Sequence, residues 1–301
     1  MKQDKNHRRW MNLLRLLIVF SLLIVYFQNT PVYPALAYSG DYALEFDGVS
    51  DFVQLDTALN ILGSNWQSTK TISVWVRPTG IAPDVAAIAN VPLGDMIVGD
   101  HPRWFGIYQA NVTPTNQDRI WVWNTDNTDL VGNAYIGIPY TIGEWVHITL
   151  VHTNNMLYAY KNGILIGSQP SGRTAYAHTS ASTIKLRIGG RETGQLFQGQ
   201  IDEVRMWNTA LTENEIRQDM YRTLAGTESG LAAYYKMSNG TGTILTDDSI
   251  HTWDGTLADG ATGAGNVPPD GDTATWVTSG AFAGPRNALD FDGTDDYVSV
   301  P

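Results

Sequence analysis

Apolar and polar residues alternate along several stretches of the chain, which is typical of β-strands that bury one face. Thr71–Arg77 (TISVWVR) places Ile72, Val74 and Val76 on one face. Ile184–Ile188 (IKLRI) alternates in the same way, so its three aliphatic residues should face inward and its lysine and arginine outward. The pattern therefore predicts half-buried strands in both places.

Leu157–Ile166 (LYAYKNGILI) predicts a hairpin, because Asn162-Gly163 suits the two positive φ angles of a type I′ turn. Four further strand candidates have a similar pattern: Trp104–Ala110, Arg119–Asn124, Trp145–His152 and Ile201–Trp207. Many short strands joined by turns indicate an all-β sandwich or jelly roll. We therefore expect two antiparallel sheets that pack face to face.

One short helix is predicted after the last of these strands. Thr212 and Glu215 have the spacing of a capping box, in which each side chain accepts a hydrogen bond from a free backbone N–H. Apolar residues then recur every four positions as far as Leu224, and Gly226 is placed to end the helix. We expect this helix to cover an edge or one end of the sandwich.

The segment Tyr42–Asp56 (YALEFDGVSDFVQLD) returns at the end of the chain as Asn287–Pro301 (NALDFDGTDDYVSVP). The spacing is that of a whole domain, not of a short solenoid repeat. We therefore expect one domain over residues 38–237 and a second, truncated repeat over residues 287–301. Residues 238–286, rich in Gly, Thr and Asp, are predicted to connect the two or to begin the second, as ordered loops that contain Trp253 and Trp276.

The N-terminus has the pattern of a signal peptide over residues 1–37. Basic residues precede Leu16–Phe27, which carries no charge, and an Ala-x-Ala sequence ends at Ala37. Because Arg15 shortens the apolar stretch, cleavage is expected, with an uncleaved anchor as the alternative. The sequence therefore predicts a secreted or cell-surface protein, and bacterial export is favoured.

Charge and cysteine content exclude several functions. The net charge is −11, so nucleic acid and anionic membranes are not expected partners, beyond an uncleaved N-terminal anchor. There is no cysteine, which excludes disulfides, thiolate metal sites and cysteine nucleophiles. An exported chain without disulfides must be stabilised by a large core, by bound ions, or by both.

Seven motifs occur in a characteristic order: ALEFDGVSDFVQL, TISVWVRP, GEWVHITLV, LYAYKNGILIG, LRIGG, FQGQIDEVRMWNTALTENEI and GLAAYYKM. In this order the chain resembles the LamG-like jelly-roll family of the concanavalin A-like lectin/glucanase superfamily, from about Gly40 to Met237. The IDEVRMWNTALTENEI segment is the most specific of the seven. The resemblance implies a two-sheet jelly roll and a binding or adhesion module whose partner is a glycan or a cell-surface protein.

Asp47 and Asp51 bracket a glycine-containing turn, where two carboxylates can share a hard cation such as Ca²⁺. The resemblance implies a structural calcium site near this turn, close to the acidic residue of the IDE segment. The implied ligands are Asp47, Asp51 and Asp202. The alternative is that Asp47-Gly48 only forms a turn and that Asp202 only ends a strand.

A set of aromatic residues could form a sugar-binding surface. Trp121 and Trp123 share one face of a predicted strand, and Trp104 and Tyr108 share a face of the preceding one. Aromatic faces bury the apolar C–H groups of a pyranose, so the four side chains are candidate ligand contacts. Ordinary packing is the alternative.

No catalytic constellation is expected. Asp202 and Glu203 are adjacent in a strand and should face opposite ways, whereas a retaining glucanase needs two acids about 5 Å apart. Glu45 and Asp47 alternate suitably, but no third acid follows them. The sequence thus predicts a non-catalytic recognition module. A glucanase-like glycoside hydrolase and a purely structural spacer of a longer surface protein are the alternatives.

Overall fold

The structure is a computed structural model. It describes residues 42–62, 69–81, 84–86, 94–100, 105–113, 117–124, 134–171, 185–191, 193–261 and 266–281. The predicted signal peptide, the predicted second repeat and Trp104 lie outside these residues. Among the described residues, no helix is both long enough and apolar enough to cross a membrane.

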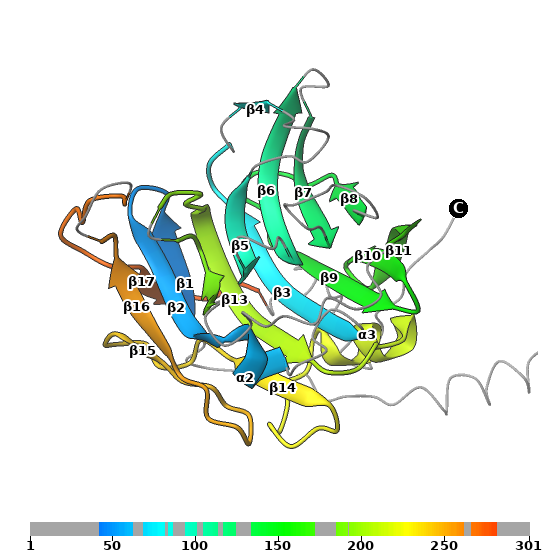
Figure 1. Ribbon diagram of the computed structural model, residues 1–301. Helices are drawn as coiled ribbons and strands as arrows, with labels where there is room; N and C mark the ends of the chain where they lie inside the picture. Colours follow the sequence, from blue (N-terminus) through cyan, green and yellow to red (C-terminus); the bar gives the residue numbers. More distant parts are fainter. Residues whose placement is uncertain are drawn as a thin grey trace, which may run out of the picture. The chain divides into compact units, whose positions relative to one another are not determined.

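The described residues form two sheets that are almost entirely antiparallel, which confirms the all-β sandwich (Figure 1). The first sheet has the order β11 (Ile164–Pro170), β10 (Met156–Lys161), β9 (Val146–Thr153), β3 (Lys70–Pro78), β13 (Gln198–Trp207), β1 (Tyr42–Asp47) and β17 (Thr275–Thr278), with β14 (Leu231–Tyr235) paired to β13. Neighbouring strands are mostly distant in sequence, as in a jelly roll.

The second sheet has the order β15 (Ile244–Leu245), β16 (Gly255–Asp259), β2 (Asp51–Thr57), β12 (Lys185–Ile188), β5 (Asp95–Asp100), β6 (Phe105–Thr113), β7 (Gln117–Asn124) and β8 (Ala134–Ile138). A short strand, β4 (Asp84–Ala86), pairs in parallel with β6. Two short helices are described, α2 (Ala58–Leu62) and α3 (Glu213–Asp219).

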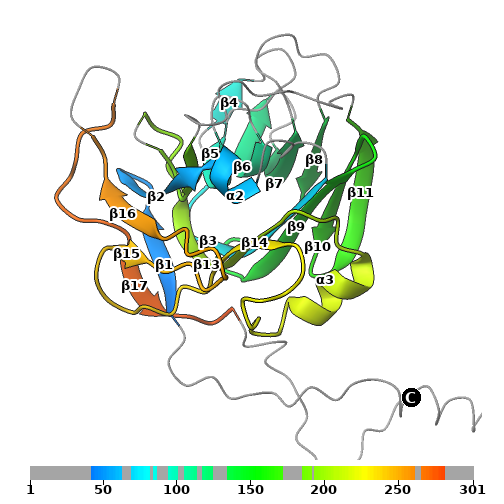
Figure 2. The ribbon, with the colours of Figure 1, turned by 60° about the horizontal axis from the view of Figure 1, so that its bottom comes forward.

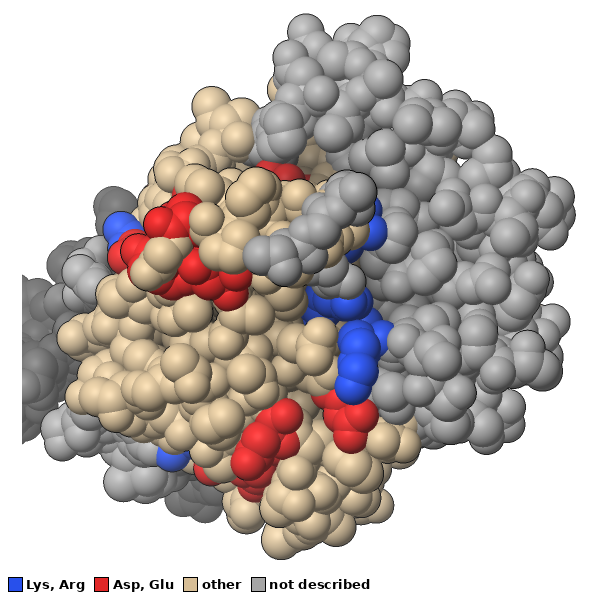
Figure 3. Space-filling model, turned by 60° about the vertical axis from the view of Figure 1, so that its left-hand side comes forward, with Lys and Arg blue, Asp and Glu red and all other residues tan. Residues whose placement is uncertain are grey.

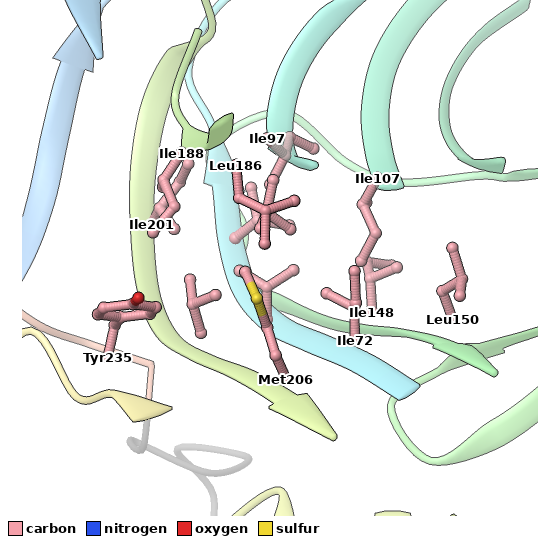
Figure 4. Close-up of a cluster of buried hydrophobic side chains, with 14 of the residues drawn as sticks. Ile72, Ile97, Ile107, Ile148, Leu150, Leu186, Ile188, Ile201, Met206 and Tyr235 are labelled. Carbon is pink, nitrogen blue, oxygen red and sulfur yellow. The ribbon is translucent and has the colours of Figure 1, made fainter. Parts of the chain in front are cut away.

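The main core lies between the two sheets. Val74 from β3 and Leu186 from β12 are fully buried in the same cluster, as the alternation of their strands predicts. Figure 4 shows aliphatic side chains from both sheets meeting in this layer, with Ile188 and Ile97 opposite Ile201 and Met206. The hydrophobic effect, through the burial of these aliphatic side chains, therefore stabilises the packing of the two sheets.

The outer face of the first sheet is also covered, by α3 and the chain after it. Figure 2 shows α3 beside β10 and β11, on the side away from the second sheet. Ile216 of α3 packs there against Val151 and Tyr160. His147 is buried on this face, and burial together with the nearby Arg205 charge lowers the pKa of His147 to about 3, so the imidazole stays neutral at physiological pH.

The predicted hairpin is confirmed. β10 pairs antiparallel with β11, and Asn162 and Gly163 between them have φ angles of +49° and +74°. Positive φ at both central positions is what a type I′ turn requires.

The predicted helix begins as expected but ends early. Thr212 accepts a hydrogen bond from Glu215 N–H, and the Glu215 carboxylate accepts one from Thr212 N–H, so the capping box is complete. The helix ends at Asp219, before the Leu224 and Gly226 of the prediction. Arg205 donates hydrogen bonds to the carbonyl oxygens of Asp219 and Arg222, and Arg222 N–H also donates to the Asp219 carbonyl at 3.0 Å. A tight turn and a side chain of the sheet therefore take the place of a further α-helical turn.

Residues 238–281 contribute three strands to the sandwich, which therefore continues past the predicted boundary at residue 237. β16 pairs with β2 and β17 pairs with β1. β16 and β17 contain few branched aliphatic residues, so the alternation of apolar and polar residues does not reveal them in the sequence.

Candidate functional site

The turn between β1 and β2 presents the carboxylate of Asp47. Asp47 Oδ1 accepts a hydrogen bond from Val49 N–H at 2.7 Å, which closes the turn. Gly48 has a φ of +81°, and a Cβ atom there would lie 3.0 Å from Cβ of Gln198. A glycine is therefore needed for both the conformation and the close approach. Asp51 begins the next strand.

Two carboxylates from the segment before β17 join Asp47. Oxygen atoms of Asp47, Asp270 and Asp272 lie within 4.8 Å of one another, and all three side chains are exposed. We call these three residues the acidic triad. Acidic side chains gather in a patch on the side of the molecule that carries β1, β16 and β17 (Figure 3). The sequence does not single out Asp270 and Asp272, because their Pro-Asp-Gly-Asp segment lies in the predicted connecting region.

Asp259 holds this segment against the turn. Its two carboxylate oxygens accept hydrogen bonds from the backbone N–H groups of Asp270 and Gly271, each at 3.0 Å. The Ser50 hydroxyl donates another to Oδ1 at 2.7 Å. The Ser50 hydroxyl and these backbone bonds lower the pKa of Asp259, which therefore stays ionised as a support for the segment.

Asp51 lies beneath the acidic triad. The side chain is buried, with a relative exposure of 3 %, and Oδ1 accepts no hydrogen bond from the residues that the structure describes. Burial, followed by the charge of Asp47, raises the pKa of Asp51 to about 7, and the carboxylates of Asp270 and Asp272 add to the effect. A buried carboxylate oxygen without a donor, beside three like charges, is an unusual arrangement for a purely structural turn.

The third implied calcium ligand, Asp202, lies elsewhere. Asp47 is opposite Gln198 in the β1–β13 pair, and Asp202 is four residues further along β13. At about 3.3 Å per residue, this separates the two Cα positions along the strand by roughly 13 Å. The Asp202 carboxylate accepts a hydrogen bond from the Ser279 hydroxyl. The structure thus brings Asp47 and Asp51 together but not Asp202.

The expectation that Asp202 and Glu203 face opposite ways is wrong, because β13 contains a bulge between Asp202 and Arg205. Glu203 has a φ of +52°. Its carboxylate accepts hydrogen bonds from Arg205 and from the Tyr234 hydroxyl, on the outer face of the first sheet. Asp202 pairs with Trp75, whose indole donates to the Met220 carbonyl on that same face. An extra residue in a strand shifts the alternation by one, which the sequence pattern does not reveal.

The predicted aromatic surface lies on the outer face of the second sheet. Trp123 and Tyr108 are fully buried and stack on one another, with ring centroids 4.6 Å apart. Trp121 is half-buried and its indole N–H donates to the Ala110 carbonyl at 3.2 Å. Of the four candidates, Trp121 alone is described with a partly exposed side chain.

A second pair of carboxylates lies at one edge of the inter-sheet layer. Burial and the neighbouring Asp118 carboxylate raise the pKa of Asp95 to about 7. Burial also raises the pKa of Asp118, although the Tyr140 hydroxyl donates a 2.5 Å hydrogen bond to Asp118 Oδ2. Acids of raised pKa are typical of acid–base chemistry, but they also occur in structural polar clusters. No motif in the sequence marks this pair.

Comparison with known proteins identifies the family to which the fold belongs. The family model described as the concanavalin A-like lectin/glucanases superfamily matches residues 47–217, more than half of the chain. Human pappalysin-1 is 24% identical over 183 residues, which are 59% of this chain and 11% of that protein. This chain therefore spans only about a tenth of the length of that curated relative.

The solved structures that are similar to the chain include two from bacteria. A candidate carbohydrate-binding protein from Bacteroides ovatus ATCC 8483 has a TM-score of 0.54 and 19% identity, over 73% of this chain and 58% of that one. Domain 4 of the extracellular GH43 arabinanase AbnA from Geobacillus stearothermophilus, solved with arabinotriose, has a TM-score of 0.41 and 18% identity, over 58% of this chain and 75% of that one.

Proposed function

The chain belongs to the concanavalin A-like lectin/glucanases superfamily, and from this premise we propose that it is an exported, non-catalytic module that binds glycans with the help of a calcium ion. The observation that carries the proposal is the acidic triad beside the β1–β2 turn, with the buried Asp51 carboxylate beneath it. Export is proposed from the N-terminal sequence pattern alone.

The residues fit a calcium ion. Ca²⁺ takes six to eight oxygen ligands at about 2.4 Å, so two oxygens that share one ion lie at most about 4.8 Å apart. The oxygens of Asp47, Asp270 and Asp272 meet this limit. Asp51 is not one of these three ligands, but its buried Oδ1 accepts no hydrogen bond from the described residues, so a nearby positive charge would stabilise its ionised form. A bound calcium ion would offset two of these negative charges and would join the β1–β2 turn to the segment before β17.

The acids nearest to a glucanase pattern have structural partners, which supports a non-catalytic role. Glu45 accepts a hydrogen bond from Gln200 at 3.0 Å, and Glu203 is paired with the buried Arg205. Asp95 and Asp118, whose pKa values are raised by burial, are the described pair that we consider as the catalytic alternative. If the protein hydrolysed soluble glucans, the substitution Asp95→Asn should abolish the release of reducing ends.

A glycan array tests the proposal directly. The labelled protein, applied with calcium, should bind weakly to neutral glycans on the array, and EDTA should release the bound protein. Retention that EDTA leaves unchanged would contradict the role of calcium. If the protein binds no glycan on the array, it is a spacer or an adhesion module for another protein, and the glycan proposal is wrong.

A further inference from the structure

The structure has an open depression where the edges of the two sheets meet. It measures about 490 Å³ and lies between β17, at the edge of the first sheet, and β15 and β16, at the edge of the second. Trp276 of β17 lines it, together with Asp259, Asp272 and the backbone of Gly242 before β15. A concave site with a few polar groups and an aromatic wall is the usual form of a small-ligand site.

Trp276 is held in a fixed orientation within this depression. Its indole N–H donates a hydrogen bond to the Gly242 carbonyl at 2.9 Å, which joins the edges of the two sheets. Part of the ring packs against the main core, and part of it remains exposed. Because the only polar atom of the ring is already bonded, the exposed part offers an apolar surface, which suits the C–H groups of a sugar ring.

The depression and the acidic triad share a residue. Asp272 lines the depression and also belongs to the triad, so a cation in the triad would lie at the wall of the depression. Three carboxylates leave part of a coordination shell of six to eight oxygens unfilled. Vicinal hydroxyl groups are neutral oxygen donors that can fill such positions without adding to the crowded negative charge.

We propose that this depression is the glycan subsite, in which two vicinal hydroxyls of a neutral sugar complete the coordination of a calcium ion held by Asp47, Asp270 and Asp272, while the indole of Trp276 packs against the sugar ring. This inference rests on the proposed function and gives it a location. It places the ligand at the junction of the sheet edges and not on the aromatic surface of β6 and β7.

Two tryptophan substitutions separate this inference from the wider proposal. On the glycan array with calcium, Trp276→Ala should lower the signal at every glycan that the unchanged protein binds by about tenfold or more. The substitution removes the aromatic contact that orients the sugar ring. Trp121→Ala, which tests the aromatic surface of β6 and β7 as the alternative subsite, should leave the signals within about twofold. If Trp121→Ala loses the binding signal while Trp276→Ala keeps it, the proposed subsite is wrong but the glycan-binding function is still supported. If the unchanged protein binds no glycan on the array, both the subsite and the glycan-binding function are wrong.

Because Trp276 also packs against the core, a second measurement uses the unchanged protein. Tb³⁺ in place of calcium reports, through its luminescence lifetime, how many water molecules it binds. Addition of a glycan retained on the array should displace about two of them, because sugar hydroxyls take their places. A per-O-methylated form of the same glycan should have no effect. An unchanged lifetime with the free glycan would overturn the direct coordination.

Discussion

The buried pair of Glu203 and Arg205 offers the sharpest test of how this chain is held together. Their side chains are 0 % and 2 % exposed, and one guanidinium–carboxylate distance is 2.5 Å. Arg205 also donates to the backbone carbonyls of Asp219 and Arg222, and the Tyr234 hydroxyl donates to Glu203 at 2.7 Å. These contacts fasten the chain after α3 onto the sheet.

We expect Arg205→Met to lower the free energy of unfolding by about 3–5 kcal/mol, because it leaves a carboxylate buried without its counter-charge. Glu203→Gln should cost a similar amount, since it strands the guanidinium instead. The double variant Glu203→Gln/Arg205→Met should cost at least about 2 kcal/mol less than the sum of the two, because neither charge then remains alone.

Urea unfolding followed by tryptophan fluorescence measures these differences through the midpoint and slope. The matched control is Arg217→Met, which removes a 2.6 Å ion pair with Glu213 at the surface of α3. Both partners there are more than a third exposed, so the loss should be at most about 0.5 kcal/mol. A cost of less than about 1 kcal/mol for Arg205→Met, or simple additivity in the double variant, would refute the reasoning.

Three further outcomes are expected. Calcium at a hundred times its dissociation constant should stabilise the protein by about 2.7 kcal/mol in thermal unfolding, and Asp47→Ala should remove the shift; an equal shift in that variant would count against the site. In EDTA, stability should fall as the pH rises from about 4 to about 7, because the folded state favours the protonated form of Asp51, whose pKa is raised to about 7; Asp51→Asn should flatten this part of the profile, and an unchanged slope would exclude Asp51 as its source. Thr212→Ala should cost about 1 kcal/mol through loss of the helix cap, measured against Thr256→Ala on an exposed strand position; equal costs would argue against the capping box as a stabilising feature.

Local patterns predicted those parts of the fold that depend on neighbouring residues. The Asn162-Gly163 turn, the inward face of β3 and the start of α3 depend on residues close together in sequence, and each was predicted correctly. The end of α3 was not, because it depends on Arg205, a side chain from another element.

The candidate site was predicted only in part for the same reason. Asp47 and Asp51 belong to one turn, so their closeness follows from the sequence. Asp270 and Asp272 reach that turn through the pairing of β17 with β1 and through the hydrogen bonds to Asp259, although they lie more than 200 residues from Asp47 in the sequence. The burial of Trp123 could not be predicted from the sequence either. The alternation of apolar and polar residues in a strand indicates which face a side chain occupies but not what covers that face.

The pairing of β17 with β1 has a mechanical consequence. Tyr42 at the start of β1 is opposite Thr278 at the end of β17, so the chain enters and leaves this edge at the same end of the pair. A pulling force applied through the flanking chain would peel the hydrogen bonds apart one after another, which needs far less force than shearing them together. The loss of β17 would carry away the segment with Asp270 and Asp272, so tension along the chain would dismantle the acidic triad before the core between the sheets gives way.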